Sequence, residues 1–318
     1  MLSRNEFDNY DPGVDQYANR KAKLVVGDLE PAFTGEPKVS IMISTWNRQW
    51  QLARSLECLA RQEWKEFEVL IMDDGSTQDF SPIFDLFSNF LQLRTFRAER
   101  NSWRSCPSRA YKSMLPEVKG EVVVITHPEM MLHFDAVQSL YQGCTSSEKL
   151  EDAYYYSLRK SSELAGDWTW MSLKPQFLDQ SYYMMLDIAD WHTKVENVWK
   201  LPGFMNIIGF SGKPNSEHVT WKAYPWWFVG AAKRECPIWD DMPTIDGHGI
   251  IDMWLMSYRS TYNFVEIAPN KPTCLHQPHQ VSAIAPKGEQ KSDALKIQQK
   301  LSNQKILSNI KNVVYNTR

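Results

Sequence analysis

The sequence predicts an α/β fold in which a mostly parallel central sheet is flanked by helices. Three short apolar runs carry this prediction, because each has the length of a buried strand and ends abruptly in polar residues; they are residues 39–44, 69–72 and 121–126. Between the first two runs, residues 50–62 have apolar side chains at helical spacing, so strand, helix and strand make a βαβ unit. Parallel strands end at the same edge of a sheet, and open α/β sheets bind ligands at that edge. We therefore expect a ligand site at the ends of these three strands.

The remaining elements are predicted from apolar spacing and turn residues along the chain. The helical patterns lie at residues 80–91, 105–119, part of 133–165, 250–258 and 288–314. The strand patterns lie at residues 91–96, 226–230 and 263–267. Loops and turns are expected at residues 1–37, which form an extension, at 274–279, and at 166–225, where short helices are also expected. Residues 166–225 mix aromatic, Gly and Pro residues without a clean period, and we expect these loops to recognise a substrate.

Composition narrows the expected partners and location. A net charge of −3 over 318 residues does not favour nucleic acid or an anionic membrane as the main partner. The five cysteines form no CxxC pair, which favours reduced thiols in a cytoplasmic setting over a disulfide framework. We expect neither a signal peptide nor a transmembrane helix, because the polar start and the lack of a long apolar run exclude both patterns. Most of the thirteen tryptophans are expected in the core, with one or two facing a flat ligand such as a sugar.

The strand-end motifs together carry a family resemblance. Residues 39–48 read Val-Ser-Ile-Met-Ile-Ser-Thr-Trp-Asn-Arg, residues 67–77 read Phe-Glu-Val-Leu-Ile-Met-Asp-Asp-Gly-Ser-Thr, and residues 120–126 read Gly-Glu-Val-Val-Val-Ile-Thr. This combination closely resembles the nucleotide-binding half of family-2 glycosyltransferases of the GT-A fold. The resemblance implies a GT-A domain with two halves, between the N-terminal extension and a C-terminal helix. The domain would span residues 38–285, with a nucleotide-sugar-binding half at 38–140, an acceptor-binding half at 141–285, and the C-terminal helix at 286–318.

The resemblance assigns residues to the donor nucleotide. Asp74 and Trp46 stand at the motif positions that hold the base, where a carboxylate accepts the N3–H of uracil and an aromatic ring stacks on it. Ser44 aligns with a position that contacts the nucleotide, while Asp73 is expected to be a structural or ribose-side partner. Arg109 stands where the family places a helix arginine near the base or diphosphate, and a solvated helix arginine is the alternative. For Asp74 the alternative is a turn-capping role in Asp-Gly-Ser.

The resemblance also implies a divalent metal, Mn²⁺ or Mg²⁺, at the diphosphate. Family members follow the third strand with an Asp-x-Asp motif, whereas residues 126–129 here read Thr-His-Pro-Glu. Glu129 matches the carboxylate that binds the metal directly, and His276 or His279 is expected to supply a second ligand. A carboxylate with an imidazole suits Mn²⁺ better than Mg²⁺. The alternative for both histidines is a role in holding the loop.

An inverting transfer needs a carboxylate that removes the proton of the acceptor hydroxyl. The family places this base in a Glu-Asp pair at the start of a helix, after a Trp-Asp-Glu-like segment that matches Trp239-Asp240-Asp241 here. The Glu-Asp pair itself is missing. Asp252, the first carboxylate of the predicted helix, is the first candidate, followed by Asp246 and then His248. For Asp252 the alternative is stabilisation of the helix start by its negative charge.

These assignments predict a glycosyltransferase that moves a sugar from a nucleotide diphosphate, expected to be a UDP-sugar, to a carbohydrate or glycoconjugate acceptor. The transfer would invert the anomeric centre in one metal-assisted displacement. One alternative is a catalytically inactive nucleotide- or sugar-binding protein of the same fold, which the altered metal motif and the missing Glu-Asp pair favour. The other is a nucleotidyltransferase, against which the first strand end counts because it lacks a glycine-rich phosphate loop.

Overall fold

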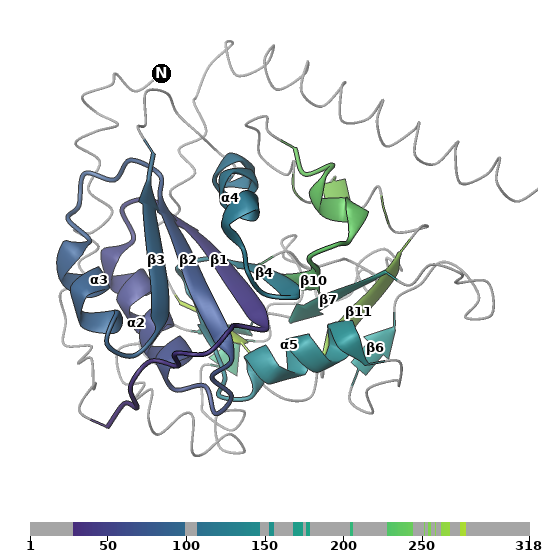
Figure 1. Ribbon diagram of the computed structural model, residues 1–318, viewed down its shortest axis with the longest axis horizontal. Helices are drawn as coiled ribbons and strands as arrows, with labels where there is room; N and C mark the ends of the chain where they lie inside the picture. The colour runs from purple at the N-terminus through teal and green to yellow at the C-terminus, as the bar shows by residue number, and fades with distance from the viewer. Residues whose placement is uncertain are drawn as a thin grey trace, which may run out of the picture.

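The computed structural model describes twelve stretches of the chain: residues 28–98, 107–146, 153–155, 168–173, 176–178, 204–205, 228–243, 251, 254–255, 258, 262–267 and 274–277. Eight strands form the central sheet, in the order β3-β2-β1-β4-β10-β7-β11-β6 (Figure 1). Their bounds are β1 (Val39–Thr45), β2 (Phe67–Asp73), β3 (Gln92–Arg97), β4 (Val122–Thr126), β6 (Ala153–Tyr155), β7 (Thr169–Leu173), β10 (Val229–Lys233) and β11 (Asn263–Ile267).

The central sheet is mostly parallel, as the sequence predicts. Strands β3, β2, β1 and β4 are parallel neighbours. Strand β10 runs antiparallel to both β4 and β7, β7 is parallel to β11, and β6 is antiparallel to β11. Among the described strands of this sheet, therefore, just β10 and β6 oppose the common direction. The predicted βαβ unit is confirmed, with α2 (Gln49–Ala60) between β1 and β2.

Apolar side chains of successive strand residues point to opposite faces of the sheet and build two separate cores. In β1, Ile41 and Ile43 belong to the core under α2, α3 (Ser81–Phe87) and α5 (Ala136–Thr145). Met42 belongs to the core on the other face, under α4 (Ser108–Met114), η2 (Leu115–Glu117) and η4 (Pro237–Trp239). Figure 1 shows α4 and α5 on opposite sides of the central strands. The result is a three-layer α/β arrangement.

A second, smaller sheet joins the chain after β4 to a segment near its end. Its order is β5-β12-β8-β9, and the strands are β5 (Met130–Leu132), β12 (Cys274–His276), β8 (Gln176–Leu178) and β9 (Phe204–Met205). β12 pairs antiparallel with β5 and parallel with β8. This sheet matters for the site, because β5 begins directly after Glu129 and β12 ends at His276.

Two of the structural expectations are wrong. Residues 166–225 contain the strands β7, β8 and β9 where loops and short helices were expected, and residues 274–276 of the expected loop form β12. Segments of two to five residues are too short to show a period, and their strand geometry comes from the partners they pair with. The predicted C-terminal helix and most of the N-terminal extension lie outside the described residues. In the described part of the chain, no helix combines the length and apolar character that a bilayer crossing needs.

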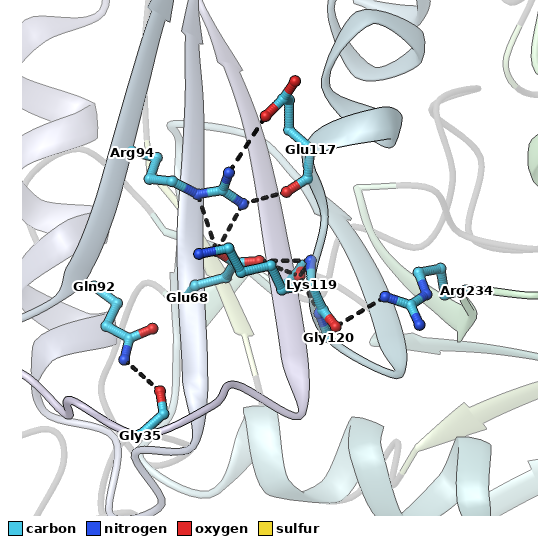
Figure 2. A network of polar contacts seen from close by, with 9 residues as sticks. Gly35, Glu68, Gln92, Arg94, Glu117, Lys119, Gly120 and Arg234 are labelled. Atoms are coloured by element: carbon cyan, nitrogen blue, oxygen red, sulfur yellow. Dashed lines mark hydrogen bonds and ion pairs between the residues drawn. The ribbon is translucent and has the colours of Figure 1, made fainter.

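A buried carboxylate ties together the amino ends of the parallel strands (Figure 2). Glu68, 2% exposed, accepts hydrogen bonds from Ser40 Oγ at 2.6 Å and from the backbone N–H of Lys119 at 2.9 Å. Arg94 on β3 donates to the other carboxylate oxygen through Nη2 at 2.8 Å and Nε at 3.1 Å. Ser40 Oγ in turn accepts from the backbone N–H of Gly120 at 2.8 Å. Residues on β1, β2 and β3 and the segment before β4 are thus fixed at one edge, which leaves the opposite edge for the ligand site.

Candidate active site

The loops that follow β1 and β2 are held against each other at the carboxyl edge of the sheet. Thr45 pairs with Asp73 in the parallel register, and the backbone N–H of Asp74 donates to the carbonyl of Thr45 at 2.9 Å. Asp74 is therefore fixed beside the end of β1, where Trp46 follows Thr45. Asp74 and Ser44 are buried at 6% and 8% exposure, and Trp46 is half-buried. The structure thus brings together the three residues that the sequence assigns to the base and nucleotide.

Asp73 has a structural role. One oxygen of its carboxylate accepts from the backbone N–H of Ser76 at 2.9 Å, and the other accepts from Arg97 Nη1 at 2.6 Å. Arg97 also donates to the carbonyl of Ser76 at 2.8 Å. Both oxygens bond protein groups, one in the loop and one at the end of β3, so of the two roles expected for Asp73 the geometry favours the structural one.

Arg109 lies on α4, whose position is fixed at the end of β4. Two residues further along this helix, the buried Tyr111 donates its hydroxyl to the carbonyl of Thr126 at 2.7 Å. Lys112 donates to the carbonyls of Trp239 at 3.0 Å and Asp240 at 2.6 Å, which ties α4 to η4. Arg109 itself is exposed on this helix. Its predicted contact with the nucleotide stays a prediction.

The turn after β4 carries the altered metal motif and lies beside the end of β12. The backbone N–H of Met130 donates to the carbonyl of His127 at 3.1 Å, which closes the turn around Pro128 and Glu129. The backbone N–H of Gln277 donates to the backbone carbonyl of Glu129 at 2.8 Å, so the backbone of His276 lies close to that of Glu129. Two of the three predicted metal ligands are thus brought together, and the third, His279, lies outside the described residues.

Phe228 packs between the two histidines of this region. Its ring centroid is 5.7 Å from that of His127 and 5.9 Å from that of His276, the second pair meeting edge to face. His127 also meets Tyr111 edge to face at 6.3 Å. Both histidines are buried at 8–9% exposure. Within the described part of the chain, no group of three or more His, Cys, Asp or Glu side chains is arranged to hold a metal ion.

The predicted base candidates Asp252, Asp246 and His248 lie outside the described residues. Their surroundings are partly described, because Ile251, Trp254 and Leu255 are buried in the core on the α4 face. Near them, the hydroxyl of Tyr258 donates to the carboxylate of Asp241, the last residue of the predicted Trp-Asp-Asp segment. These described residues thus pack on the face of the sheet that also carries η4.

Sequence reasoning missed two polar residues that organise this edge. Gln277 is fully buried and donates through Nε2 to the carbonyls of Gln51 at 2.9 Å and Pro128 at 3.3 Å, so it joins β12, α2 and the turn after β4. Asn47 is 1% exposed and bonds the loop after β2. The sequence did carry a signal for Asn47, because an Asn directly after a predicted strand favours a left-handed turn. Gln277 had none, because its partners lie far away in the sequence.

Comparisons with known proteins were made at the level of sequence and of structure. The sequence matches the model of the family described as Glycosyl transferase family 2 over residues 40–195. It is 38% identical over 72 residues to hyaluronan synthase of Pasteurella multocida, covering 22% of this chain and 7% of that protein. It is 32% identical over 89 residues to the poly(ribitol-phosphate) beta-N-acetylglucosaminyltransferase TarS of Staphylococcus aureus, covering 27% of this chain and 15% of that protein.

A third relative is the GalNAc(5)-diNAcBac-PP-undecaprenol beta-1,3-glucosyltransferase of Campylobacter jejuni, 25% identical over 107 residues, which cover 33% of this chain and 34% of that protein. The matched segments thus span 7–34% of these relatives' own length. Among solved structures, S. aureus TarS 1–349 is similar with a TM-score of 0.48 and 14% identity, over 76% of this chain and 60% of that one. The match to the family model begins in β1 and runs past β4 and Glu129, through the whole predicted donor half. Residues 40–195 of this chain therefore form a region of glycosyl transferase family 2.

Proposed function

We propose that this protein transfers a sugar from a UDP-sugar to the hydroxyl of a carbohydrate or glycoconjugate acceptor, with inversion and with the help of Mn²⁺ or Mg²⁺. The observation that carries the proposal is the arrangement at the carboxyl edge. Trp46, Asp74 and Glu129 follow the ends of β1, β2 and β4, which are neighbours in the sheet. Base recognition and diphosphate recognition can therefore occur side by side on one ligand.

The donor's uracil would lie between Trp46 and Asp74. The half-buried ring of Trp46 offers a stacking surface, and the carboxylate of Asp74 is an acceptor for the N3–H of uracil. Cytosine has no N3–H, so this pairing selects uracil over cytosine. Ser44, one residue before the end of β1, is the proposed further contact to the nucleotide.

The donor set near the diphosphate fits a divalent cation. Glu129 supplies a carboxylate and His276 an imidazole from adjacent backbone positions, and the diphosphate oxygens can complete the coordination. Such a cation, when bound, neutralises charge that develops on the leaving diphosphate. His279 is the proposed further ligand of this site.

The chemical step would be a single in-line displacement. A carboxylate takes the proton of the acceptor hydroxyl, the acceptor oxygen bonds to the anomeric carbon, and the bond from that carbon to the UDP oxygen breaks. Asp252 is the proposed base, with Asp246 second. The burial of Ile251, Trp254 and Leu255 on the α4 face supports a helix there that can present Asp252.

The assay that tests the proposal is UDP release from a panel of donors, with Mn²⁺, with Mg²⁺ and with EDTA. The names of the relatives suggest UDP-N-acetylglucosamine and UDP-glucose as the first donors. We expect turnover with at least one UDP-sugar, abolished by EDTA and reduced in Glu129→Ala. The matched control is Glu121→Ala, at the opposite end of β4, where the carboxylate is exposed. Metal-dependent turnover that is undiminished in Glu129→Ala would refute the metal assignment.

A second candidate is a nucleotide-binding protein without transferase activity, which the histidine at position 127 in the altered metal motif favours. This second candidate predicts UDP binding without release of UDP from any donor.

A further variant tests the proposed base. Full transferase activity in Asp252→Asn would move the proposed base to Asp246.

A further inference from the structure

The two loops at the proposed donor site contain unusual backbone conformations. Asn47 has a φ of 48°, and Gly75 has a φ of 74°. Within the described ranges these are the residues with left-handed backbone, one in the loop after β1 and the other in the loop after β2. Glycine adopts this region freely, and Asn adopts it more readily than other residues with a side chain but still at a cost; such conformations are concentrated at functional sites. Asn47 is therefore the residue whose conformation needs a reason.

The hydrogen bonds of Asn47 join the two loops. Its backbone N–H donates to Ser76 Oγ at 2.9 Å. Its side-chain Oδ1 accepts from the backbone N–H of Thr77 at 2.8 Å, from Thr77 Oγ1 at 3.2 Å and from the backbone N–H of Gln78 at 3.3 Å. One buried residue thus reaches three successive residues of the opposite loop. The loop after β1 can move relative to the loop after β2 only if these bonds break.

The loop that receives Asn47 is itself held in place. Asp73 accepts from the backbone N–H of Ser76, and Arg97 bonds both Asp73 and the Ser76 carbonyl. The loop after β2 therefore offers a fixed surface, and Asn47 fixes the loop after β1 upon it. Trp46 directly precedes Asn47, and Asp74 lies two residues before Ser76. The hydrogen bonds of Asn47 thus join the two loops whose side chains are proposed to hold the base.

The other half of the amide carries an energetic penalty. The Nδ2 of Asn47 is buried and has no hydrogen-bond partner among the residues that the structure describes. A buried donor without a partner opposes folding. Together with the left-handed backbone, this places two unfavourable features on one residue.

We propose that Asn47 is a positioning residue for the nucleotide, setting the distance and angle between Trp46 and Asp74. This inference rests on the proposed function, because it assumes that a uracil nucleotide binds between these two side chains. Stacking and hydrogen bonding must act on the same base at once, so a shift of one loop weakens both. The effect falls on binding of the donor, while the acceptor side is left unchanged.

The test measures UDP binding by calorimetry in the presence of Mn²⁺, for the full chain and three variants. Asn47→Gly keeps the left-handed backbone but removes the amide, and Ser76→Ala removes the acceptor of the Asn47 N–H. Gln62→Ala is the matched control, because Gln62 is also 1% exposed and its amide bonds His133 and Val137 away from the proposed site. We expect the Kd for UDP to rise about tenfold in Asn47→Gly, and by a smaller factor in Ser76→Ala. Gln62→Ala should lower the melting temperature and leave the Kd unchanged.

Steady-state kinetics give the second measurement. The KM for the donor should rise with the Kd in Asn47→Gly, and the KM for the acceptor should stay constant. Unchanged UDP affinity in both site variants, with wild-type binding intact, would refute the positioning role and leave the proposed function standing. An equal loss of affinity in Gln62→Ala would also refute it, since general destabilisation would then be the cause. If the wild-type protein binds no uracil nucleotide, the proposed function fails, and this inference fails with it. Should Asn47→Gly not fold, Ser76→Ala decides alone.

Discussion

Replacing Glu68 by alanine should lower the free energy of unfolding by about 3 kcal/mol without changing UDP binding. Glu68 lies at the amino edge of the sheet, where it joins Ser40, Arg94 and the backbone of Lys119 (Figure 2). The proposed nucleotide site lies at the carboxyl ends of the same strands. Stability and binding should therefore respond separately to this substitution.

The magnitude follows from the contacts of the carboxylate. Removing one partner of a buried ion pair costs about 3–5 kcal/mol, because the other partner and its neighbours lose their compensation. The side chain of Arg94 is 28% exposed and water can solvate part of its charge, which favours the lower end of this range. Ser40 Oγ would still accept a hydrogen bond from the backbone N–H of Gly120, so Ser40 would lose only part of its hydrogen bonding. For a chain of this size, about 3 kcal/mol corresponds to a fall in melting temperature of roughly 4–5 °C.

Urea denaturation followed by circular dichroism gives the change in stability, and UDP calorimetry at low temperature gives the binding. Gln92→Ala is the control, since Gln92 makes an exposed hydrogen bond to the carbonyl of Gly35 in the same region and its removal should change stability by less than about 0.5 kcal/mol. A Glu68→Ala protein as stable as the wild type would show that the network is not a stabilising anchor. A large loss of UDP affinity in folded Glu68→Ala would show that the two edges are not independent.

Three further predictions concern the proposed base site, the stability of the protein at alkaline pH and the reactivity of its thiols. Asp74→Asn and Trp46→Ala should each raise the Kd for UDP by roughly 10- to 100-fold in a calorimetric titration, since Asn replaces the charged acceptor of the uracil N3–H with a neutral amide and Ala removes the stacking ring; unchanged affinity in both would refute the base site. Burial, followed by the nearby Cys236 and Asp241, raises the pKa of Tyr262 to about 12, and burial likewise raises that of Tyr258. The folded state then holds these protons more tightly than the unfolded state, so the stability that these two tyrosines contribute is constant below about pH 10 and is lost as the pH rises from 10 to 12; the fall of the urea midpoint over that range should be smaller in Tyr262→Phe than in the wild type. Burial raises the pKa of four thiols, those of Cys58, Cys144, Cys236 and Cys274. These thiols should react with a thiol reagent in denaturant and not in the native protein, and rapid labelling of all four in the native protein would contradict their burial.

The parallel half of the fold follows from local sequence. The segments that became β1, β2 and β4 are buried along their whole length, and each contains a short run of mostly apolar residues that the chain reveals without its partners. Helix α2 between them shows its spacing directly. The second half differs, because β8 and β9 have three and two residues and take their geometry from neighbours far away in the sequence. No local period identifies strands of that length.

The site divides in the same way. Trp46 and Asp74 are recognisable because each follows a strand that the sequence reveals, and parallel strands must end at one edge. The adjacency of Glu129 and His276 depends on the pairing of β5 with β12, across nearly 150 residues of chain. The resemblance to the family suggested that pair, but the chain's own pattern did not, since residues 274–279 were expected to form a loop. The base candidates and the domain boundaries remain predictions.

The sequence alone determined the layered α/β fold, and it predicted the edge proposed for ligand binding and the two side chains proposed to hold the base. These depend on the order of residues within one strand and the turn after it, which is local information. Only the tertiary structure decided how the loops are locked and what lies beside Glu129. Asn47 meets Ser76 and Thr77 across the sheet edge, and Gln277 joins α2 to the turn after β4. Those contacts come from long-range pairing, and the geometry of a hydrogen bond between distant segments is fixed only when the whole sheet has formed.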